Sequence, residues 1–490
     1  MSGGAARARR WLVGSLIVAF WLTMTVWLVR REVLPAHGRL RPAQAVTEPR
    51  ERWYGVFADG GRLGVVHLVQ RPEERGGTEG TTLHLTAALS LTVAGSTERV
   101  QLAGSLWRPL AAGKAELSGS LVSGEHRLEL AGTIRDGFLE AVVTSAGEEI
   151  PLSTRVDEEL FATGGLSPLG STLPPLAPGE EVLLPGFDPM TLQPTRVRVR
   201  RPKGAEAPGG GPAEAAQALL VTSGASTITV WTDTEGEILE ATTPFGVRLR
   251  RLTRQEALAG DQPSAPPELL ARSLVVPQGK RPMRGARRLV VHLSGIEQAL
   301  PEDDTQAQLR PATYRVQPQR PLPGGTQTLL PTGFLTPEPL VQSDHPRVRA
   351  AAAAAVAGAT EVWEKVQRLN RWVHDHVAKE PVVSLPSALD VLSSREGDCN
   401  EHTVLFTALA RAAGVPCRMA VGLVWSEELQ AFGYHAWPEV WVGRWVWVDP
   451  TLGQEVADAT HLKLVEGGIE RWGQVLAFLG QLQVEVVEVE

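Results

Sequence analysis

The chain has 490 residues, of which 43% are apolar and 21% are charged, a globular composition that excludes disorder throughout. This length is enough for roughly two to four domains of ordinary size. The net charge is -7 and no basic stripe is interleaved with aromatic residues, so the sequence argues against a nucleic-acid-binding protein.

An apolar stretch near the N-terminus predicts a membrane anchor. Residues 11–29 carry no charge, arginines flank them on both sides, and the stretch is long enough to span a bilayer. A cleavable signal peptide is the alternative, but its apolar run is usually shorter, and the residues that follow directly, REVLPAHG, offer no A-x-A cleavage pattern. We therefore expect an N-terminal transmembrane anchor at 1–31 and a Pro/Ala/Arg-rich tether at 32–50.

The orientation of this anchor is only weakly determined by sequence, because arginines lie at both of its ends. The rest of the chain has no second apolar stretch of that length and has the character of an exported protein. We expect a cytoplasmic N-terminus and an extracytoplasmic, periplasmic bulk held by this single helix.

Residues 51–258 predict an antiparallel β-rich domain. Within 83–93 the apolar side chains alternate, as in a strand with one buried face. Further short strands are expected at 126–134, 138–144, 195–200 and 226–232. Hairpin turns are indicated at Asp59-Gly60-Gly61 and at 233–236. No catalytic constellation stands out in this region.

Segments rich in Pro, Gly and Ala interrupt the chain at 202–213, 259–268 and 318–338. We interpret the first as a surface loop and the other two as linkers. Between the linkers, RRLVVHLSG and ATYRVQPQ predict short strands. Residues 269–320 are thus expected to form a short β-containing subdomain or an extension of the β-rich domain.

From about residue 339 to 490 the pattern becomes helical and then mixed. Helices are expected over the alanine-rich residues 347–358, over 360–378, and from Cys399 to Ala413, where Gly414 supplies the end. The second of these helices has apolar residues at spacings of three and four, which form one stripe: Val362, Val366, Leu369, Val373 and Val377.

Cys399 has the setting of a nucleophile. Only two cysteines are present, Cys399 and Cys417, so a disulfide framework is excluded, and a bridge between them would abolish thiol chemistry. Cys399 follows Gly397-Asp398 at the first turn of a helix, where free N–H groups and the helix dipole stabilise a thiolate. Its own N–H is a candidate oxyanion donor. We interpret Cys417 as a small buried core residue.

A base and its orienting carboxylate are expected on a following hairpin. His435 opens an alternating strand and Asp449 ends the next one. If residues 442–444 form a three-residue loop, Trp441 faces Trp445, and His435 and Asp449 share a face as diagonal neighbours. The carboxylate can then fix the imidazole tautomer while the other ring nitrogen meets the sulfur. A two-residue loop would put the two side chains on opposite faces.

The motifs GDCNEHTVLFTALARAAGVPCRMAVGL, YHAWPEVWV and WVWVDPT resemble those of bacterial transglutaminase-like superfamily proteins, over roughly 340–465. The resemblance implies an α+β, papain-like transglutaminase-like domain at 339–490, with Cys399 as nucleophile, His435 as base and Asp449 as third member. No triad position is substituted, and Cys417 stands where the family usually has alanine. The resemblance implies no cofactor, and no side-chain donor for the oxyanion hole was assigned.

Other residues near the motif have a structural and a functional interpretation. Cys399 and His402 spell C-x-x-H, but no second pair at zinc-like spacing exists, so no metal is expected. Trp437, next to the base, and His402, on the nucleophile helix, are candidates for the substrate cleft. For Trp441 and Trp445 we favour cross-strand packing.

The sequence leaves two functions open. The first is a membrane-anchored thiol enzyme acting on peptide or protein amides through an acyl-enzyme, as a peptidase or amidase with water and as a transglutaminase with an amine. The second is a non-catalytic cell-envelope binding protein that uses the papain-like cleft and the β-rich domain. The intact triad favours the first.

Overall fold

The computed structural model describes residues 47–490 with gaps, the longest of which are 157–174, 260–273, 323–329, 381–386 and 469–473. The predicted anchor at 1–31 and most of the tether lie outside the described residues. Among the described residues, no helix has the length and apolar character needed to cross a membrane. The contacts divide the chain into two compact units, a β-rich unit that ends at Pro267 and a C-terminal unit from Glu268 to Glu490.

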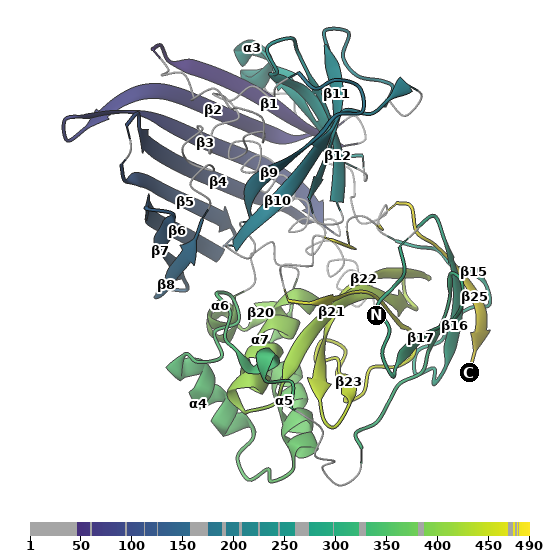
Figure 1. Ribbon diagram of the computed structural model, residues 1–490. Helices are drawn as coiled ribbons and strands as arrows, with labels where there is room; N and C mark the ends of the chain where they lie inside the picture. Colours follow the sequence, from purple (N-terminus) through teal and green to yellow (C-terminus); the bar gives the residue numbers. More distant parts are fainter. Residues whose placement is uncertain are drawn as a thin grey trace. The chain divides into compact units, whose positions relative to one another are not determined.

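The β-rich unit contains one antiparallel sheet of 14 strands in the order β8 to β1, then β14 to β9 (Figure 1). Two meanders therefore meet where β1 pairs with β14. A short helix, α3, Arg254–Leu258, follows the last strand. The strands are β1 Arg50–Ala58, β2 Gly61–Arg75, β3 Thr78–Val93, β4 Ser96–Pro109, β5 Ala115–Ser123, β6 His126–Arg135, β7 Phe138–Ser145, β8 Glu148–Arg155, β9 Glu181–Asp188, β10 Gln193–Arg200, β11 Gln217–Ser223, β12 Ser226–Thr232, β13 Ile238–Thr242 and β14 Arg248–Leu252.

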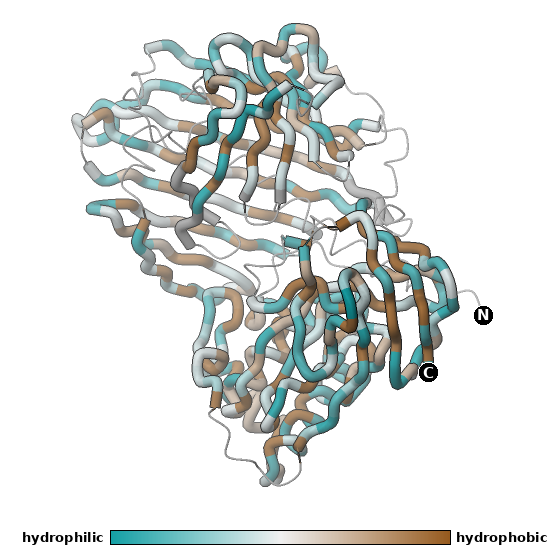
Figure 2. The backbone as a smooth tube through the Cα atoms, turned by 45° about the vertical axis from the view of Figure 1, so that its right-hand side comes forward, coloured by the Kyte–Doolittle hydropathy of each residue, from teal (hydrophilic) through white to brown (hydrophobic). Residues whose placement is uncertain are grey.

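Alternation of apolar and polar side chains along these strands positions the core of the β-rich unit (Figure 2). Leu83, Leu85, Ala87 and Leu89 of β3 are all buried, as the period of two predicts. Both predicted hairpins are present, since β1 pairs with β2 and β12 pairs with β13. Buried residues of β4 to β8 share one apolar cluster with residues of β10 and β11. The two parts of the sheet therefore pack against each other through their apolar faces.

The C-terminal unit contains a five-stranded sheet in the order β15-β25-β16-β18-β17. Its strands are β15 Gln278–Gly279, β16 Leu289–Ser294, β17 Gln306–Arg310, β18 Thr313–Val316 and β25 Gln483–Val489. We expected 269–320 to form a separate subdomain or an extension of the β-rich domain. Instead its strands take the C-terminal strand β25 into their sheet, with Val484 and Val486 buried and Glu485 exposed. The segment is thus part of the C-terminal unit.

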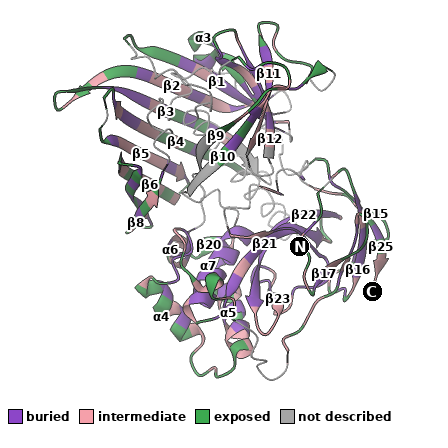
Figure 3. Cartoon of the chain, viewed as in Figure 1, coloured by how far each residue is buried: buried purple, intermediate pink, exposed green. Residues whose placement is uncertain are grey.

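The remainder of this unit is a helical layer on a four-stranded antiparallel sheet of order β23-β22-β21-β24. Helix α7 lies against β21 and β22, and α4, α5 and α6 pack around it, so that α7 is buried (Figure 3). The elements are η3 Thr332–Leu335, α4 Pro346–Ala355, α5 Val362–His376, β19 Ala378–Lys379, α6 Ala388–Ser394, β20 Glu396–Gly397, α7 Cys399–Ala412, β21 Cys417–Ser426, β22 Ala431–Trp441, β23 Trp445–Trp447 and β24 His461–Gly467.

The three helices expected from the sequence are present, and α6 is an addition to them. The apolar stripe of α5 is buried at Val366, Leu369 and Val373, and Val377, which caps the helix, is buried as well. Val362, the first helical residue, is 46% exposed.

A buried ion cluster joins the two sheets of the C-terminal unit. The ammonium group of Lys463, on β24, donates to Glu439 Oε1 at 2.8 Å, to Glu466 Oε2 at 2.9 Å and to Asp303. Asp303 lies between β16 and β17, and it also accepts the indole N–H of Trp447 at 3.0 Å. Burial alone would lower the pKa of Lys463, but Glu439 and Asp303 raise it. Lys463 therefore remains an ammonium ion in the interior.

Replacing Lys463 by methionine is expected to destabilise the protein by about 3–5 kcal/mol, because the carboxylates of Asp303, Glu439 and Glu466 would lose the ammonium and be left with Arg418 as a cationic partner. Urea unfolding of the full chain, followed by tryptophan fluorescence, measures the change. Lys280→Met, at an exposed lysine of the same unit, is the matched control and should stay close to wild type. Equal stability of the two variants would contradict this role for Lys463.

Candidate active site

The sequence around Cys399 specifies both ends of α7. Asp398 is the N-cap, its carboxylate accepts the N–H of Asn400 at 2.8 Å, and its own N–H donates to Glu401 Oε2 at 2.9 Å, which forms a capping box. Gly397 is needed here because a Cβ at this position would lie 2.2 Å from Cβ of Glu401. Cys399 is the first helical residue and is 3% exposed. Its thiol therefore lies at the positive end of the helix dipole.

The other end of α7 is the one predicted from Gly414. This glycine has a φ of 79°, and the N–H of Val415 donates to the carbonyl of Ala410 at 2.9 Å, as in a Schellman motif. The chain then enters β21 through Cys417. Burial raises the pKa of the Cys417 thiol to about 12, so this second cysteine is an inert core residue.

The β22–β23 hairpin has the three-residue loop that the sequence predicts. Trp441 pairs with Trp445, and Gly443 between them has a φ of 85°. The two tryptophan rings meet edge to face with centroids 5.4 Å apart, which fits the cross-strand packing we favoured. The strand register therefore brings His435 and Asp449 to the same side of the sheet.

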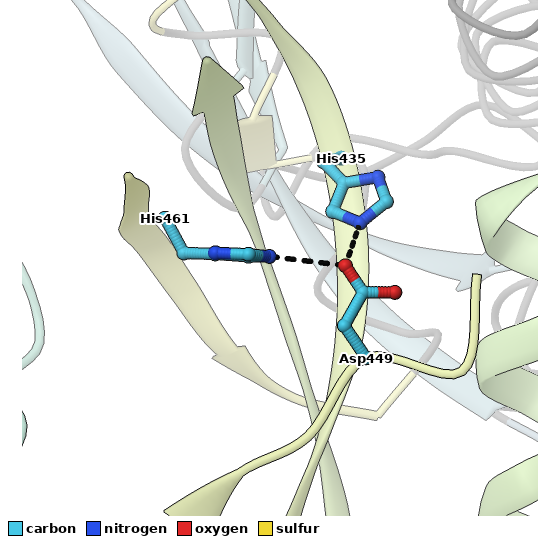
Figure 4. Close-up of side chains that lie close together, drawn as sticks. All are labelled: His435, Asp449 and His461. Atoms are coloured by element: carbon cyan, nitrogen blue, oxygen red, sulfur yellow. Dashed lines mark hydrogen bonds and ion pairs between the residues drawn. The ribbon is translucent and has the colours of Figure 1, made fainter. Parts of the chain in front are cut away.

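His435 and Asp449 form a buried hydrogen-bonded pair (Figure 4). His435 Nε2 lies 2.7 Å from Asp449 Oδ2, and Asp449 Oδ1 accepts the N–H of Leu452 at 2.9 Å. Since a carboxylate only accepts, Nε2 carries the proton, and in the neutral ring Nδ1 has the lone pair. Burial lowers the pKa of His435, and Asp449 offsets only part of this effect. The imidazole is thus neutral at rest and suited to act as a base.

A second imidazole, His461, donates to the same carboxylate oxygen. The sequence motifs did not point to this residue. His461 Nε2 lies 3.0 Å from Asp449 Oδ2, and Nδ1 lies 3.0 Å from the carbonyl oxygen of Asp458 (Figure 4). Burial would lower the pKa of His461, but Asp449 and Asp458 raise it to about 9. Burial alone would raise the pKa of Asp449, yet His435 and His461 hold it well below its usual range.

Buried polar groups surround the start of α7. Burial, with Asp398 beside it, raises the pKa of Glu401 well above its usual value. Tyr434 donates from its hydroxyl to Asn400 Oδ1 at 3.3 Å. Its pKa is raised well above the ordinary value by burial and by the nearby charge of Cys399. The Tyr434 hydroxyl therefore keeps its proton, which it donates to Asn400.

The two residues expected in a substrate cleft, Trp437 and His402, are both 0% exposed. Trp437 packs between His461 and Trp447, with ring centroids 5.1 and 5.4 Å away. His402 lies 2.7 Å through Nδ1 from the carbonyl oxygen of Asp398, and burial lowers its pKa to about 4. Both side chains thus lie in the interior and do not line an exposed cleft.

Two groups of side chains have spacings that a metal ion could use. Donor atoms of His435, Asp449 and His461 lie within 4.8 Å of one another, as do those of Asp303, Glu439 and Glu466. In the first group, hydrogen bonds from both imidazoles to one oxygen explain the spacing. In the second, the ammonium of Lys463 holds the three carboxylates together. We identify neither group as a metal site.

Cys399 thus begins a buried helix, and a His-Asp pair lies on the sheet against which that helix packs. Residues 349–450 match the family model described as Transglutaminase-like superfamily. The C-terminal unit therefore contains a transglutaminase-like domain, which confirms the resemblance found in the sequence. Among curated proteins, no relative matches the chain.

Several solved structures are similar at low identity. A candidate cysteine protease from Cytophaga hutchinsonii is 16% identical, with 44% of this chain and 85% of that chain covered and a TM-score of 0.28. The periplasmic domain of TgpA from Pseudomonas aeruginosa is 16% identical over 57% of this chain and 72% of that one, with a TM-score of 0.22. A β-barrel-like protein from Brucella abortus is 12% identical over 44% and 96%, with a TM-score of 0.28. Scores this low carry no argument about activity.

The raised pKa of His461 predicts a stability that depends on pH. Its folded value of about 9 lies above the unfolded value of about 6.5, so the stabilisation is fully present below pH 6.5 and is lost as the pH rises through 9. Between these limits the wild type should lose on the order of 3 kcal/mol that His461→Gln does not lose. Urea unfolding at intervals from pH 6 to 10 measures this difference.

His292→Gln is the matched control for that measurement. His292 lies on β16 in the same unit, and its Nδ1 contacts Thr313 Oγ1 at 3.0 Å, away from the triad residues. This variant should follow the wild-type curve throughout. A parallel curve for His461→Gln would mean that His461 carries no additional proton in the folded protein.

Proposed function

We propose that this protein is a membrane-anchored, extracytoplasmic thiol enzyme that cleaves or transfers amide bonds through an acyl-cysteine intermediate. The observation that carries the proposal is the buried 2.7 Å pair of His435 Nε2 and Asp449 Oδ2. It lies on the sheet against which α7, with Cys399 at its first position, packs. The transglutaminase-like match supports the same chemistry.

In the proposed reaction, His435 Nδ1 takes the proton of Cys399 Sγ, and the thiolate adds to the carbonyl carbon of the amide. When the tetrahedral intermediate collapses, the C–N bond breaks, and the leaving amine takes the proton from His435. A thioester on Cys399 remains. An acceptor then gives its proton to His435 and adds to the thioester, and collapse releases the acyl product and restores the thiol.

The developing oxyanion needs donors that are fixed in advance. The N–H of Cys399, at the first position of α7, is one donor that we propose. The Tyr434 hydroxyl is the side chain that we propose as a second donor, and its single O–H would have to turn from Asn400 Oδ1 to the oxyanion. The substrate would be a peptide or protein amide. Water as acceptor gives hydrolysis, and an amine gives transamidation.

One observation favours the alternative, a non-catalytic binding protein of the cell envelope. Cys399 and His435 are only 3% and 4% exposed, so an amide can reach the thiol only after neighbouring groups move. A domain with this closed site could bind its partner at another surface, including the β-rich unit. Reactivity of the thiol separates the two functions.

Alkylation of Cys399 in the full chain is the first test of the proposal. The rate with iodoacetamide, followed by mass spectrometry from pH 4 to 9, should stay high well below the pKa of about 8.5 of a free thiol. His435→Ala should lower the rate at pH 7 by about 10²–10⁴, the usual contribution of a positioned base. Asp449→Asn should lower it as well, because the amide can present a donor to Nε2.

Cys417 provides an internal control for this experiment, because a fully buried thiol with a pKa of about 12 should not react. Labelling of both cysteines would indicate unfolding. Slow labelling of Cys399 that follows an ordinary thiol titration in wild type and His435→Ala alike would refute the enzymatic proposal and favour the binding function.

The acyl acceptor can be determined with a glutamine-containing protein substrate such as casein. We expect release of ammonia or of new peptide ends by wild type and no release by Cys399→Ser. Incorporation of a fluorescent primary amine, measured in the same reactions, reports transamidation. Activity that is equal in Cys399→Ser and wild type would exclude an acyl-cysteine.

A further inference from the structure

His461 begins β24 and is completely buried, and both of its ring nitrogens have acceptors. Nε2 lies 3.0 Å from Asp449 Oδ2. Nδ1 lies 3.0 Å from the carbonyl oxygen of Asp458 and 3.4 Å from its Oδ1. No donor to either nitrogen is found among the described residues. The ring is therefore held at both ends by acceptor oxygens.

A count of protons follows from these contacts. A carbonyl oxygen only accepts, so Nδ1 of His461 carries a proton. Asp449 accepts the N–H of Leu452 and receives Nε2 of His435, which is the role of an ionised carboxylate. Nε2 of His461 must therefore also carry a proton. An imidazole with protons on both nitrogens is a cation, and a pKa of about 9 for this ring agrees with that count.

Asp458 fixes the far end of the ring. Its carboxylate accepts from the N–H of Gly285 at 3.0 Å, from Gln454 Nε2 at 2.8 Å and from the N–H of Thr460 at 2.9 Å. The charged groups that face His461 are thus Asp449 and Asp458, and the His435 ring lies beyond Asp449 with its centroid 5.7 Å away. These side chains follow one another in the order Asp458, His461, Asp449 and His435. The first three are negative, positive and negative, and His435 is neutral.

We propose that His461 is a positioning residue of the triad, a buried imidazolium that aims Asp449 Oδ2 at His435 Nε2 and offsets part of the carboxylate's charge. Because Asp449 is held from two sides, its oxygen defines the ring orientation of His435. Because its charge is shared, His435 gains less from becoming protonated and stays a neutral base at rest. This inference rests on the proposed function, in which His435 serves Cys399.

The pH dependence of Cys399 alkylation in the full chain tests this role. His461→Gln keeps a donor for Asp449 but removes the positive charge, which should raise the pKa of the Cys399–His435 system. We expect the rising limb of the rate to move up by about one pH unit, so that the rate at any pH on that limb falls about tenfold. His461→Leu, which has no donor, should lose more. His292→Gln should match wild type.

The charge on His461 can also be measured directly by NMR. In full-length Cys399→Ser labelled with ¹⁵N-histidine, we expect both ring nitrogens of His461 to show the imidazolium signature at pH 7 and to titrate near pH 9. The His461→Gln spectrum assigns the resonances. A neutral ring at pH 7 overturns the inference, and so does an unchanged pH profile in a folded His461→Gln.

The two proposals fail in different ways. A wild-type Cys399 that is inert at every pH contradicts the enzyme but leaves the ¹⁵N measurement able to decide the charge of His461. A reactive wild type whose profile does not depend on His461 contradicts only the positioning role.

Discussion

The ionised carboxylate of Asp449, fully buried, is the constraint on which the rest of the site depends. A charge without contact with water is tolerated only when donors surround it, and here they are two imidazoles and a main-chain N–H. Each donor comes from a different place in the chain: His435 from β22, His461 from β24, and Leu452 from the turn after Asp449. This carboxylate therefore remains charged only if β22, β24 and the turn after Asp449 are all in their correct places.

The same principle explains why a base and a cation of the same residue type lie side by side. His435 faces one acceptor and is desolvated, so its pKa is lowered, whereas His461 faces two carboxylates and its pKa is raised to about 9. Identical side chains thus acquire opposite protonation states from the number of carboxylates that each contacts. The thiol end of the site is prepared differently, by the dipole and cap of α7.

Features determined by neighbouring residues could be predicted from the sequence. The start of α7 at Cys399 follows from the Asp398 cap, and its end follows from Gly414. The pairing of Trp441 with Trp445 follows from the parity of a loop that contains Gly443. The geometry of His435 and Asp449 depends on this parity, because a loop shorter by one residue would have turned one of them to the other face.

Features determined by distant partners could not be predicted. In HLKLV, His461 and Lys463 have the alternation of a solvent-facing strand side, yet both are fully buried, because Asp449 and Asp303 meet them from other elements. The sequence of such a strand does not reveal that its polar residues are buried, because their acceptors lie in other elements. Likewise the alternation of 483–489 predicts a strand but not its partner β16.

The pairing of β25 also constrains the order in which the chain can fold. β16 lies between β25 and β18, and β15 has β25 as its partner. The sheet is thus completed only after the whole transglutaminase-like core has left the ribosome. Until then β16 offers an unpaired edge to the surroundings, the kind of edge that recruits other chains. Chaperone protection during this interval would benefit the region from Gln278 to Val316 more than any other part of the C-terminal unit.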